Sequence, residues 1–396
     1  MSGDSTSKNI IPKNNMPENK VHRILKLAIL LACLVLLALI VISIILGYGT
    51  CASRLTGLFR TNAPVISVEE FNFDVGRDRV FAYMEGSVAA IGTLGIQVYS
   101  ADGRETLRDS FRMIKPSVVA SGNRSIAFDI GGTDVRVFES NDVTTTIEAS
   151  GNVVSASINQ NGWFCVVTQV GGGIRGSVTV YNRAGLDVYK VNLGSGYVLS
   201  AQLSPDNRSL SVLNLTDYSS RVSIYHGLDE IKDEPDAVFD LLDGLIINIA
   251  YISNAEILAI STDSVLLIDS EGNGEKLMSF SDKRLGGFAH NDNFIALHLY
   301  DHGVGHRGSL VFLHTNGTFI GELTIDREIF SMSYTGNTLI ALKSDGLAFI
   351  SYDNDDLSMY VDSISAAGAS RVLAVNEFMA IAASDHSAVV VTRNPE

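Results

Sequence analysis

The feature that most constrains the fold of this chain is a repeat of about 42 residues, which runs from about residue 64 to residue 393. Short runs in which apolar and polar residues alternate are bounded by Gly, Asn, Asp and Ser, as is typical of short β-strands. The set of runs at 153–193 contains four of them, and similar sets begin near residues 79, 117, 198, 246, 285, 329 and 370. Four short strands in roughly 40–45 residues is the period of a propeller blade, so we expect an all-β propeller.

The third run of each set marks the repeat most clearly, because it alternates regularly and is usually followed by a turn that contains glycine. Third strands are predicted at 96–99, 135–138, 178–181, 222–225, 265–268 and 310–313.

The number of sets predicts an eight-bladed β-propeller, and seven blades is the alternative if two sets have been divided wrongly. The last set, 370–393, contains only three runs, whereas one unpaired run, 66–75, precedes the first set. An open ring would leave unpaired strand edges exposed. We therefore expect 66–75 to supply the fourth strand of the last blade.

One turn carries a resemblance to known propellers. Ser204-Pro205-Asp206-Asn207 is similar to the Ser-Pro-Asp-Gly turn between the first two strands of many blades. With the repeat, it makes about 330 residues resemble the superfamily of WD-repeat, YVTN-type and quinoprotein-alcohol-dehydrogenase-like propellers, although the Trp-Asp dipeptide of true WD repeats is absent. The architecture also resembles uncharacterised single-pass membrane proteins of clostridia and related Firmicutes, which implies a location but no activity.

A long apolar run predicts a membrane anchor. Leu27–Leu46 is 20 residues long with Ser43 as its only polar side chain, and a helix of that length spans about 30 Å, the hydrocarbon thickness of a bilayer. A cleaved signal peptide is the alternative, but its apolar core is usually only about 7–15 residues.

Charge predicts the orientation of this segment. Residues 1–60 contain seven basic and two acidic residues, and the rest of the chain contains 22 and 42. Five of the basic residues precede the apolar run, and four of them lie close to it: Lys13, Lys20, Arg23 and Lys26. The positive-inside rule then places the N-terminus in the cytoplasm. We expect a disordered cytoplasmic tail at 1–23, a transmembrane helix at 24–48, a linker at 49–63 and an extracytoplasmic propeller at 64–393.

Several classes of function lack their motifs. The three cysteines form no CxxC or Cys-His spacing, which argues against a disulfide scaffold or a zinc site. There is no Gly-x-Ser-x-Gly and no phosphate-binding glycine loop, and a net charge of −15 disfavours nucleic acid as a partner. The single Trp163 and the lack of adjacent cysteines argue against the quinone enzymes that the superfamily includes. Cys165 is expected to be a buried, inert thiol. No catalytic residue, metal or cofactor is predicted.

Two similar hairpins suggest a binding face. Gly305–Ser309 parallels Gly173–Ser177, and each leads into a third strand, while Arg221 stands in a comparable place before Val222. The alternative is that glycine merely supplies the positive φ of a shared hairpin. The functional interpretation is a set of guanidinium groups that engages a carboxylate or phosphate on one face. That ligand or partner face contains Arg175, Arg221, His302, His306 and Arg307.

Histidines are concentrated in one blade, at His290, His298, His302, His306 and His314. The spacing of the middle three would suit a metal on a helix, but the segment is predicted to be a hairpin tip. We therefore expect surface histidines in loops.

The two faces of the propeller are predicted to differ in charge. The turns between third and fourth strands contain 16 acidic and four basic residues, so one face should be strongly acidic and the other nearly neutral. The best functional expectation is a non-enzymatic binding or scaffolding module, with a protein or cell-wall polymer as its partner outside the membrane. The alternative is an extracytoplasmic hydrolase or lyase that acts on glycan, with its residues dispersed among the blades.

Overall fold

The computed structural model describes residues 69–393 apart from 101–102, 172–174, 230–231, 233, 302–306, 354–355, 363–365 and 367. The compact unit that contains the repeats is Val65–Glu396. The predicted tail, transmembrane helix and linker lie outside the described residues. Within the described residues, no helix has the length and apolar character needed to cross a membrane.

The described residues form 32 strands in eight four-stranded antiparallel sheets. The first four blades are built from β2 (Val80–Met84), β3 (Ser87–Gly92), β4 (Gly95–Ser100) and β5 (Glu105–Asp109); β6 (Pro116–Ser121), β7 (Arg124–Asp129), β8 (Asp134–Phe138) and β9 (Val143–Glu148); β10 (Asn152–Ile158), β11 (Phe164–Gln169), β12 (Gly176–Tyr181) and β13 (Asp187–Leu193); and β14 (Tyr197–Leu203), β15 (Ser209–Leu215), β16 (Ser220–His226) and β17 (Ala237–Leu241). The last four are built from β18 (Ile246–Tyr251), β19 (Glu256–Ser261), β20 (Ser264–Asp269) and β21 (Gly274–Ser279); β22 (Lys283–His290), β23 (Phe294–Asp301), β24 (Gly308–His314) and β25 (Phe319–Ile325); β26 (Ile329–Thr335), β27 (Thr338–Lys343), β28 (Gly346–Asp353) and β29 (Asp356–Asp362); and β30 (Arg371–Asn376), β31 (Met379–Ala383), β32 (Ser387–Thr392) and β1 (Glu69–Asn72).

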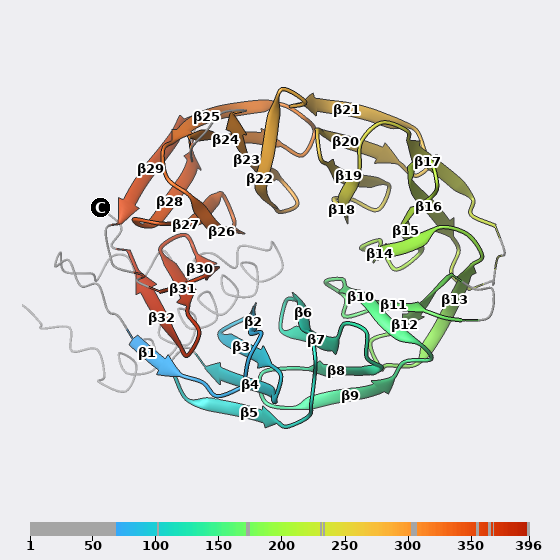
Figure 1. Ribbon diagram of the computed structural model, residues 1–396, viewed down its shortest axis with the longest axis horizontal. Helices are drawn as coiled ribbons and strands as arrows, with labels where there is room; N and C mark the ends of the chain where they lie inside the picture. Colours follow the sequence, from blue (N-terminus) through green and yellow to red (C-terminus); the bar gives the residue numbers. More distant parts are fainter. Residues whose placement is uncertain are drawn as a thin grey trace, which may run out of the picture. The chain divides into compact units, whose positions relative to one another are not determined.

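Each blade places its first strand nearest the centre of the ring and its fourth strand at the rim (Figure 1). Because neighbouring strands are antiparallel, the loops between second and third strands emerge at the same end as the connections between blades. We call this end the 2–3 face. The loops between first and second strands and those between third and fourth strands emerge at the opposite end, which we call the 1–2 face.

The ring closes as the sequence predicts. The N-terminal β1 pairs with β32, from Glu69 opposite Val390 to Asn72 opposite Ser387, and Figure 1 shows β1 in blue beside the red strands of the last blade. Within the predicted segment 66–75, residues 66–68 lie outside the described residues, and 73–75 follow the end of β1 at Asn72. The structure confirms eight blades.

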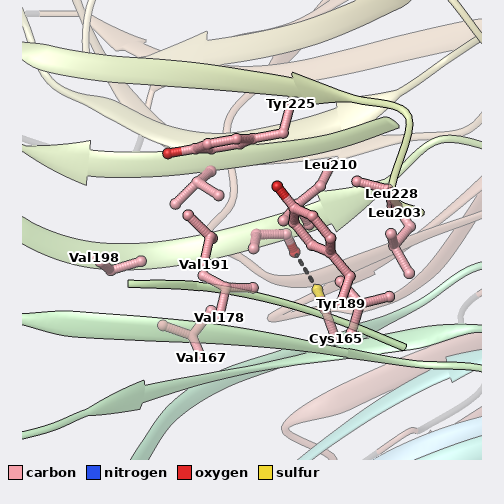
Figure 2. Close-up of a cluster of buried hydrophobic side chains, with 13 residues drawn as sticks. Cys165, Val167, Val178, Tyr189, Val191, Val198, Leu203, Leu210, Tyr225 and Leu228 are labelled. Atoms are coloured by element: carbon pink, nitrogen blue, oxygen red, sulfur yellow. Dashed lines mark hydrogen bonds between the residues drawn. The ribbon is translucent and has the colours of Figure 1, made fainter. Parts of the chain in front are cut away.

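The core lies between the blades. Second and third strands are covered on both sides, so β3, β7 and β27 are buried along their whole length, whereas the rim strand β9 alternates between half-buried and exposed residues. Figure 2 shows the core between blades 3 and 4, where Val167 and Val178 pack with Leu210. Cys165 lies in this cluster, fully buried, with its thiol donating to the carbonyl oxygen of Ala201 at 3.4 Å. The structure confirms the predicted burial of Cys165, and that burial raises the pKa of the thiol to about 12.

Candidate functional sites

Arg175 lines a small hollow on the 2–3 face. It is exposed immediately before β12, and its guanidinium carbon lies 5.8 Å from the centroid of the Tyr197 ring, which belongs to the first strand of the next blade. Tyr197 is 58% exposed. The two side chains, with Gln169 and Val198, line a cavity of about 200 Å³. The seam between blades 3 and 4 therefore offers a cation and an aromatic ring together.

The other predicted arginines are placed differently. Arg221 lies within β16, and its Nε and Nη2 donate to Oδ1 and Oδ2 of Asp240 at 2.9 and 2.8 Å. These hydrogen bonds hold the pKa of Asp240 below its usual range, so Arg221 already has a bidentate carboxylate partner. Arg307 is exposed before β24, in blade 6. His302 and His306 lie outside the described residues. The arginines share the 2–3 face, but they come from blades 3, 4 and 6.

The expectation of surface histidines is wrong for His298. This residue lies in β23, the second strand of blade 6, and is only 1% exposed. A second strand is covered by both neighbouring blades, so a side chain at this position is buried whatever its polarity.

Exposed apolar side chains gather on the 2–3 face, which the sequence analysis did not predict. Among the described residues, twelve large hydrophobic side chains are exposed. Eight of them lie in loops of the 2–3 face or in the first two residues of an innermost strand: Leu94, Ile114, Tyr197, Tyr218, Leu242, Leu245, Ile247 and Phe330. Five of these, which we call the apolar patch, come from blade 4 and the adjoining start of blade 5: Tyr197, Tyr218, Leu242, Leu245 and Ile247.

A larger hollow of about 740 Å³ opens on the 1–2 face. It is formed by the loops of blades 4 and 5 and by Trp163, which precedes β11 of blade 3. Its polar lining includes Asp206, Arg208, His226, Asp229 and Asn254. We call it the 1–2 cleft.

The wall of the 1–2 cleft is the turn that resembles those of other propellers. Ser204 Oγ donates to Asp206 Oδ1 at 2.6 Å, and the same oxygen accepts from the backbone nitrogen of Arg208 at 3.1 Å. Asn207 has a φ of 62°, a left-handed conformation that asparagine tolerates better than most residues. It stands where the related turns have glycine. The turn therefore forms as predicted, although its last residue differs.

Side-chain amides join this turn to the neighbouring blades. Asn159 of blade 3 donates through Nδ2 to Asn207 Oδ1 at 2.6 Å and to the carbonyl oxygen of Ser204 at 3.0 Å. On the other side, Asn254 Oδ1 of blade 5 accepts from the backbone nitrogen of Asp206 at 3.0 Å. Side-chain hydrogen bonds thus link three consecutive hairpins.

His226 lines the cleft and has a defined tautomer. His226 Nε2 is 3.0 Å from the carbonyl oxygen of Ser270, and Nδ1 is 2.9 Å from Ser209 Oγ. A carbonyl oxygen can only accept, so Nε2 bears the hydrogen and Nδ1 of the neutral ring accepts from the Ser209 hydroxyl. This orientation is the one that a base needs to activate a serine.

The acidic loop beside the cleft is partly neutralised from within. Asp236 Oδ2 accepts from the backbone nitrogen of His226 at 2.7 Å, and Lys232 Nζ lies 2.7 Å from Asp236 Oδ1. These hydrogen bonds lower the pKa of Asp236, the backbone bond having the larger effect. Asp236 is thereby fixed as a carboxylate that shapes the loop.

Charge differs between the faces in the predicted direction. In the loops that the observed strands delimit, the 1–2 face contains 14 acidic and 4 basic residues, against 10 and 7 on the 2–3 face. Among the described residues, no group of three or more His, Cys, Asp or Glu side chains is arranged to hold a metal ion.

Comparisons with known proteins agree with the fold. The model of a family described as "Family of unknown function (DUF5711)" matches residues 64–363. No curated protein matches the chain. Among 974 matching chains of solved structures is the crystal structure of the C-terminal WD40 domain of Sif2, with a TM-score of 0.50 and 13% identity over 80% of this chain and 81% of that one. At this level of identity the likeness extends to the propeller fold alone.

Proposed function

The chain belongs to the DUF5711 family of unknown function, and from this premise we propose that it is an extracytoplasmic binding module, anchored by its predicted helix at 24–48, whose protein partner docks on the 2–3 face. The observation that carries the proposal is the apolar patch beside the Arg175–Tyr197 hollow. Exposed aromatic side chains and arginine are the residue types enriched at protein interfaces.

Charge and connectivity support the choice of face. The 1–2 face is the more acidic, so an anionic wall polymer or membrane surface is repelled there more strongly. The strand β1 runs from the 1–2 face to the 2–3 face, because the connection that follows it leads to β2 of blade 1. The first described strand therefore begins at the 1–2 face, opposite the proposed docking surface.

The test of docking compares two triple substitutions in the full-length tagged protein, captured after crosslinking in membranes. Tyr197→Ser, Tyr218→Ser and Leu242→Ser remove part of the apolar patch and should abolish recovery of the crosslinked partner. The matched control removes exposed apolar side chains elsewhere, by Leu186→Ser, Val188→Ser and Phe319→Ser, and should leave recovery unchanged. Equal recovery from both variants, or loss in the control alone, would overturn the choice of face.

The proposed anchor has its own test. Protease added to cells stripped of their wall should digest the propeller and spare residues 1–23. Detection of a mature chain that begins near residue 49 would contradict an uncleaved anchor.

A second candidate function, hydrolysis, rests on the Ser209–His226 pair. A serine with a histidine base performs acyl transfer, so the substrate would be an ester, such as an acetyl group on a glycan. Cleavage of a glycosidic bond would instead require two carboxylates. Release of acetate from acetylated oligosaccharide by the purified protein, and its loss in Ser209→Ala, would support this function. A rate that Ser209→Ala does not change would remove it.

A further inference from the structure

We propose that the 1–2 cleft is a binding site for an uncharged oligosaccharide. Its volume of about 740 Å³ lies within the range of small-molecule sites, roughly 300–1,000 Å³. It lies on the opposite face from the proposed partner surface, so this inference does not rest on the docking proposal. Ser209 and His226, the pair of the second candidate function, line the same cleft, but the binding argued here needs no catalysis by them.

The lining offers an aromatic ring beside hydrogen-bonding groups. Trp163 is the only tryptophan of the chain; it packs against the core cluster between blades 3 and 4 and also lines the cleft. An indole is a large, flat apolar surface with a polar nitrogen at its edge, which matches a sugar ring with its apolar C–H face and its equatorial hydroxyls.

The polar groups of the cleft provide both donors and acceptors. Asn254 uses its Oδ1 on the backbone of Asp206, so its Nδ2 is oriented with two hydrogens to donate. Arg208 is exposed and forms no ion pair with a described residue. The carboxylates of Asp206 and Asp229 accept. Vicinal hydroxyl groups both donate and accept, so they can satisfy such a mixed set.

Charge disfavours an anionic ligand, because the loop 227–236 is acidic and Asp206 adds a further carboxylate to the lining. The guanidinium of Arg208 offsets part of this negative charge. A neutral polyhydroxylated molecule uses the donors of Arg208 and Asn254 as well as the carboxylate acceptors, whereas a cation leaves those donors without an acceptor.

The site is also organised in advance. The amides of Asn159 and Asn254 link the hairpins of blades 3, 4 and 5, and His226 connects β16 to the carbonyl oxygen of Ser270 in blade 5. A ligand therefore pays little to order the wall that it contacts.

The test uses the single tryptophan as the reporter. Fluorescence of the purified protein would be titrated with chitotriose, cellotriose and maltotriose as neutral probes, with trigalacturonate as an anion and with trilysine as a cation. We expect a saturable change with at least one neutral probe and none with the charged ones. Arg208→Ala and Asn254→Ala should each weaken the affinity at least threefold, and together about tenfold or more.

Controls separate this site from the partner surface. Arg175→Ser on the 2–3 face and Leu186→Ser on the 1–2 face outside the cleft should leave the affinity for the neutral probe unchanged. Two further variants would be titrated with the neutral probe by calorimetry. Trp163→Phe needs this method because it removes the fluorescence signal. Asn254→Asp preserves the shape of the side chain and the oxygen that accepts from the backbone of Asp206. The proposal is overturned by the absence of saturable binding of all three neutral probes, by preference for a charged probe, or by binding that the cleft substitutions do not weaken.

Discussion

At the scale of single residues, His298 has an unfavourable environment for a polar side chain. Both ring nitrogens are buried without a hydrogen-bond partner among the described residues, and the Tyr300 ring lies 4.3 Å away between centroids. Desolvation lowers the pKa of His298 to about 4. The propeller therefore holds this imidazole neutral and unsatisfied, which is a cost that unfolding relieves.

This burial predicts a loss of stability in mild acid. The pKa of His298 is about 4 in the folded chain and roughly 6.5 in the unfolded chain, so between those values the unfolded state binds more protons. The free energy of unfolding is therefore unaffected by His298 protonation above about pH 6.5. As the pH falls toward 4, protonation of His298 in the unfolded chain lowers that free energy by at most roughly 3 kcal/mol. The lowered pKa of His290 acts in the same direction.

Urea unfolding at pH 7, 6, 5 and 4 measures this effect. His298→Leu should flatten the part of the profile above pH 4 and leave the steeper acid limb, to which carboxylates such as Asp240 contribute. Parallel profiles for the two proteins would show that His298 does not titrate as its burial requires.

At the scale of strands, Arg124 ties blade 2 to blade 3. It begins β7 and is only 5% exposed. Its Nη1 donates to the carbonyl oxygens of Arg183 at 2.6 Å and Gly162 at 3.3 Å, and its Nε lies 3.5 Å from Glu139 Oε1. Desolvation is the main cause of its lowered pKa. One guanidinium thus satisfies two carbonyl groups of the neighbouring blade.

Replacing Arg124 should weaken the contact between these blades. Arg124→Met keeps the length of the side chain but leaves buried carbonyl oxygens unpaired, so we expect a loss of about 2–3 kcal/mol in the free energy of unfolding. Arg183→Met is the control, because that side chain is 55% exposed and lies 3.9 Å from Glu139, and it should cost less than about 1 kcal/mol. Similar losses in chemical denaturation of the two variants would argue against a role for Arg124 between blades.

The strands themselves could be predicted because their signal is local. Alternation and glycine turns placed the third strands at 96–99 and 178–181, which lie within β4 and β12. Contacts between blades have no such signal. In the sequence, Arg124 is simply a charged residue next to a turn. The residues around it do not indicate that its hydrogen-bond partner is the carbonyl oxygen of Arg183, 59 residues away.

The candidate sites likewise contain features that the local sequence predicts and features that depend on contacts between strands or blades. The hairpin pattern around Arg175 predicted an exposed arginine on the 2–3 face, where the structure places it. Its neighbour Tyr197 comes from the next blade, so the hollow between them could not be foreseen. Pairing of Arg221 with Asp240 depends on the register of β16 with β17, and the 1–2 cleft depends on how the hairpins of three blades lie side by side.

At the scale of the whole molecule, stability depends on closure of the ring by β1. Phe71 and Phe73 are 8% and 6% exposed and belong to a core cluster that contains residues of both the first and last blades. The Phe71 ring lies 5.0 Å from Tyr99 and the Phe73 ring 5.2 Å from Phe81, between centroids. The segment thus completes a sheet and also covers the seam between the first and last blades.

Removal of this segment should therefore affect the entire propeller. A protein that begins at residue 77 exposes the edge of β32 and uncovers the apolar surface of blades 1 and 8, whereas one that begins at residue 61 retains β1. We expect the shorter protein to lose its single cooperative thermal transition and to aggregate, because an uncovered edge strand pairs with other chains.

Phe73→Ala in the longer protein is a milder version of the same change, and it should lower the free energy of unfolding by about 3–5 kcal/mol while the transition stays cooperative. Glu70→Ala, on the exposed side of β1, should change it by less than about 0.5 kcal/mol. Differential scanning calorimetry of the four proteins decides the matter, since equal melting of the proteins that begin at 61 and 77 would mean that the ring is stable without its closing strand.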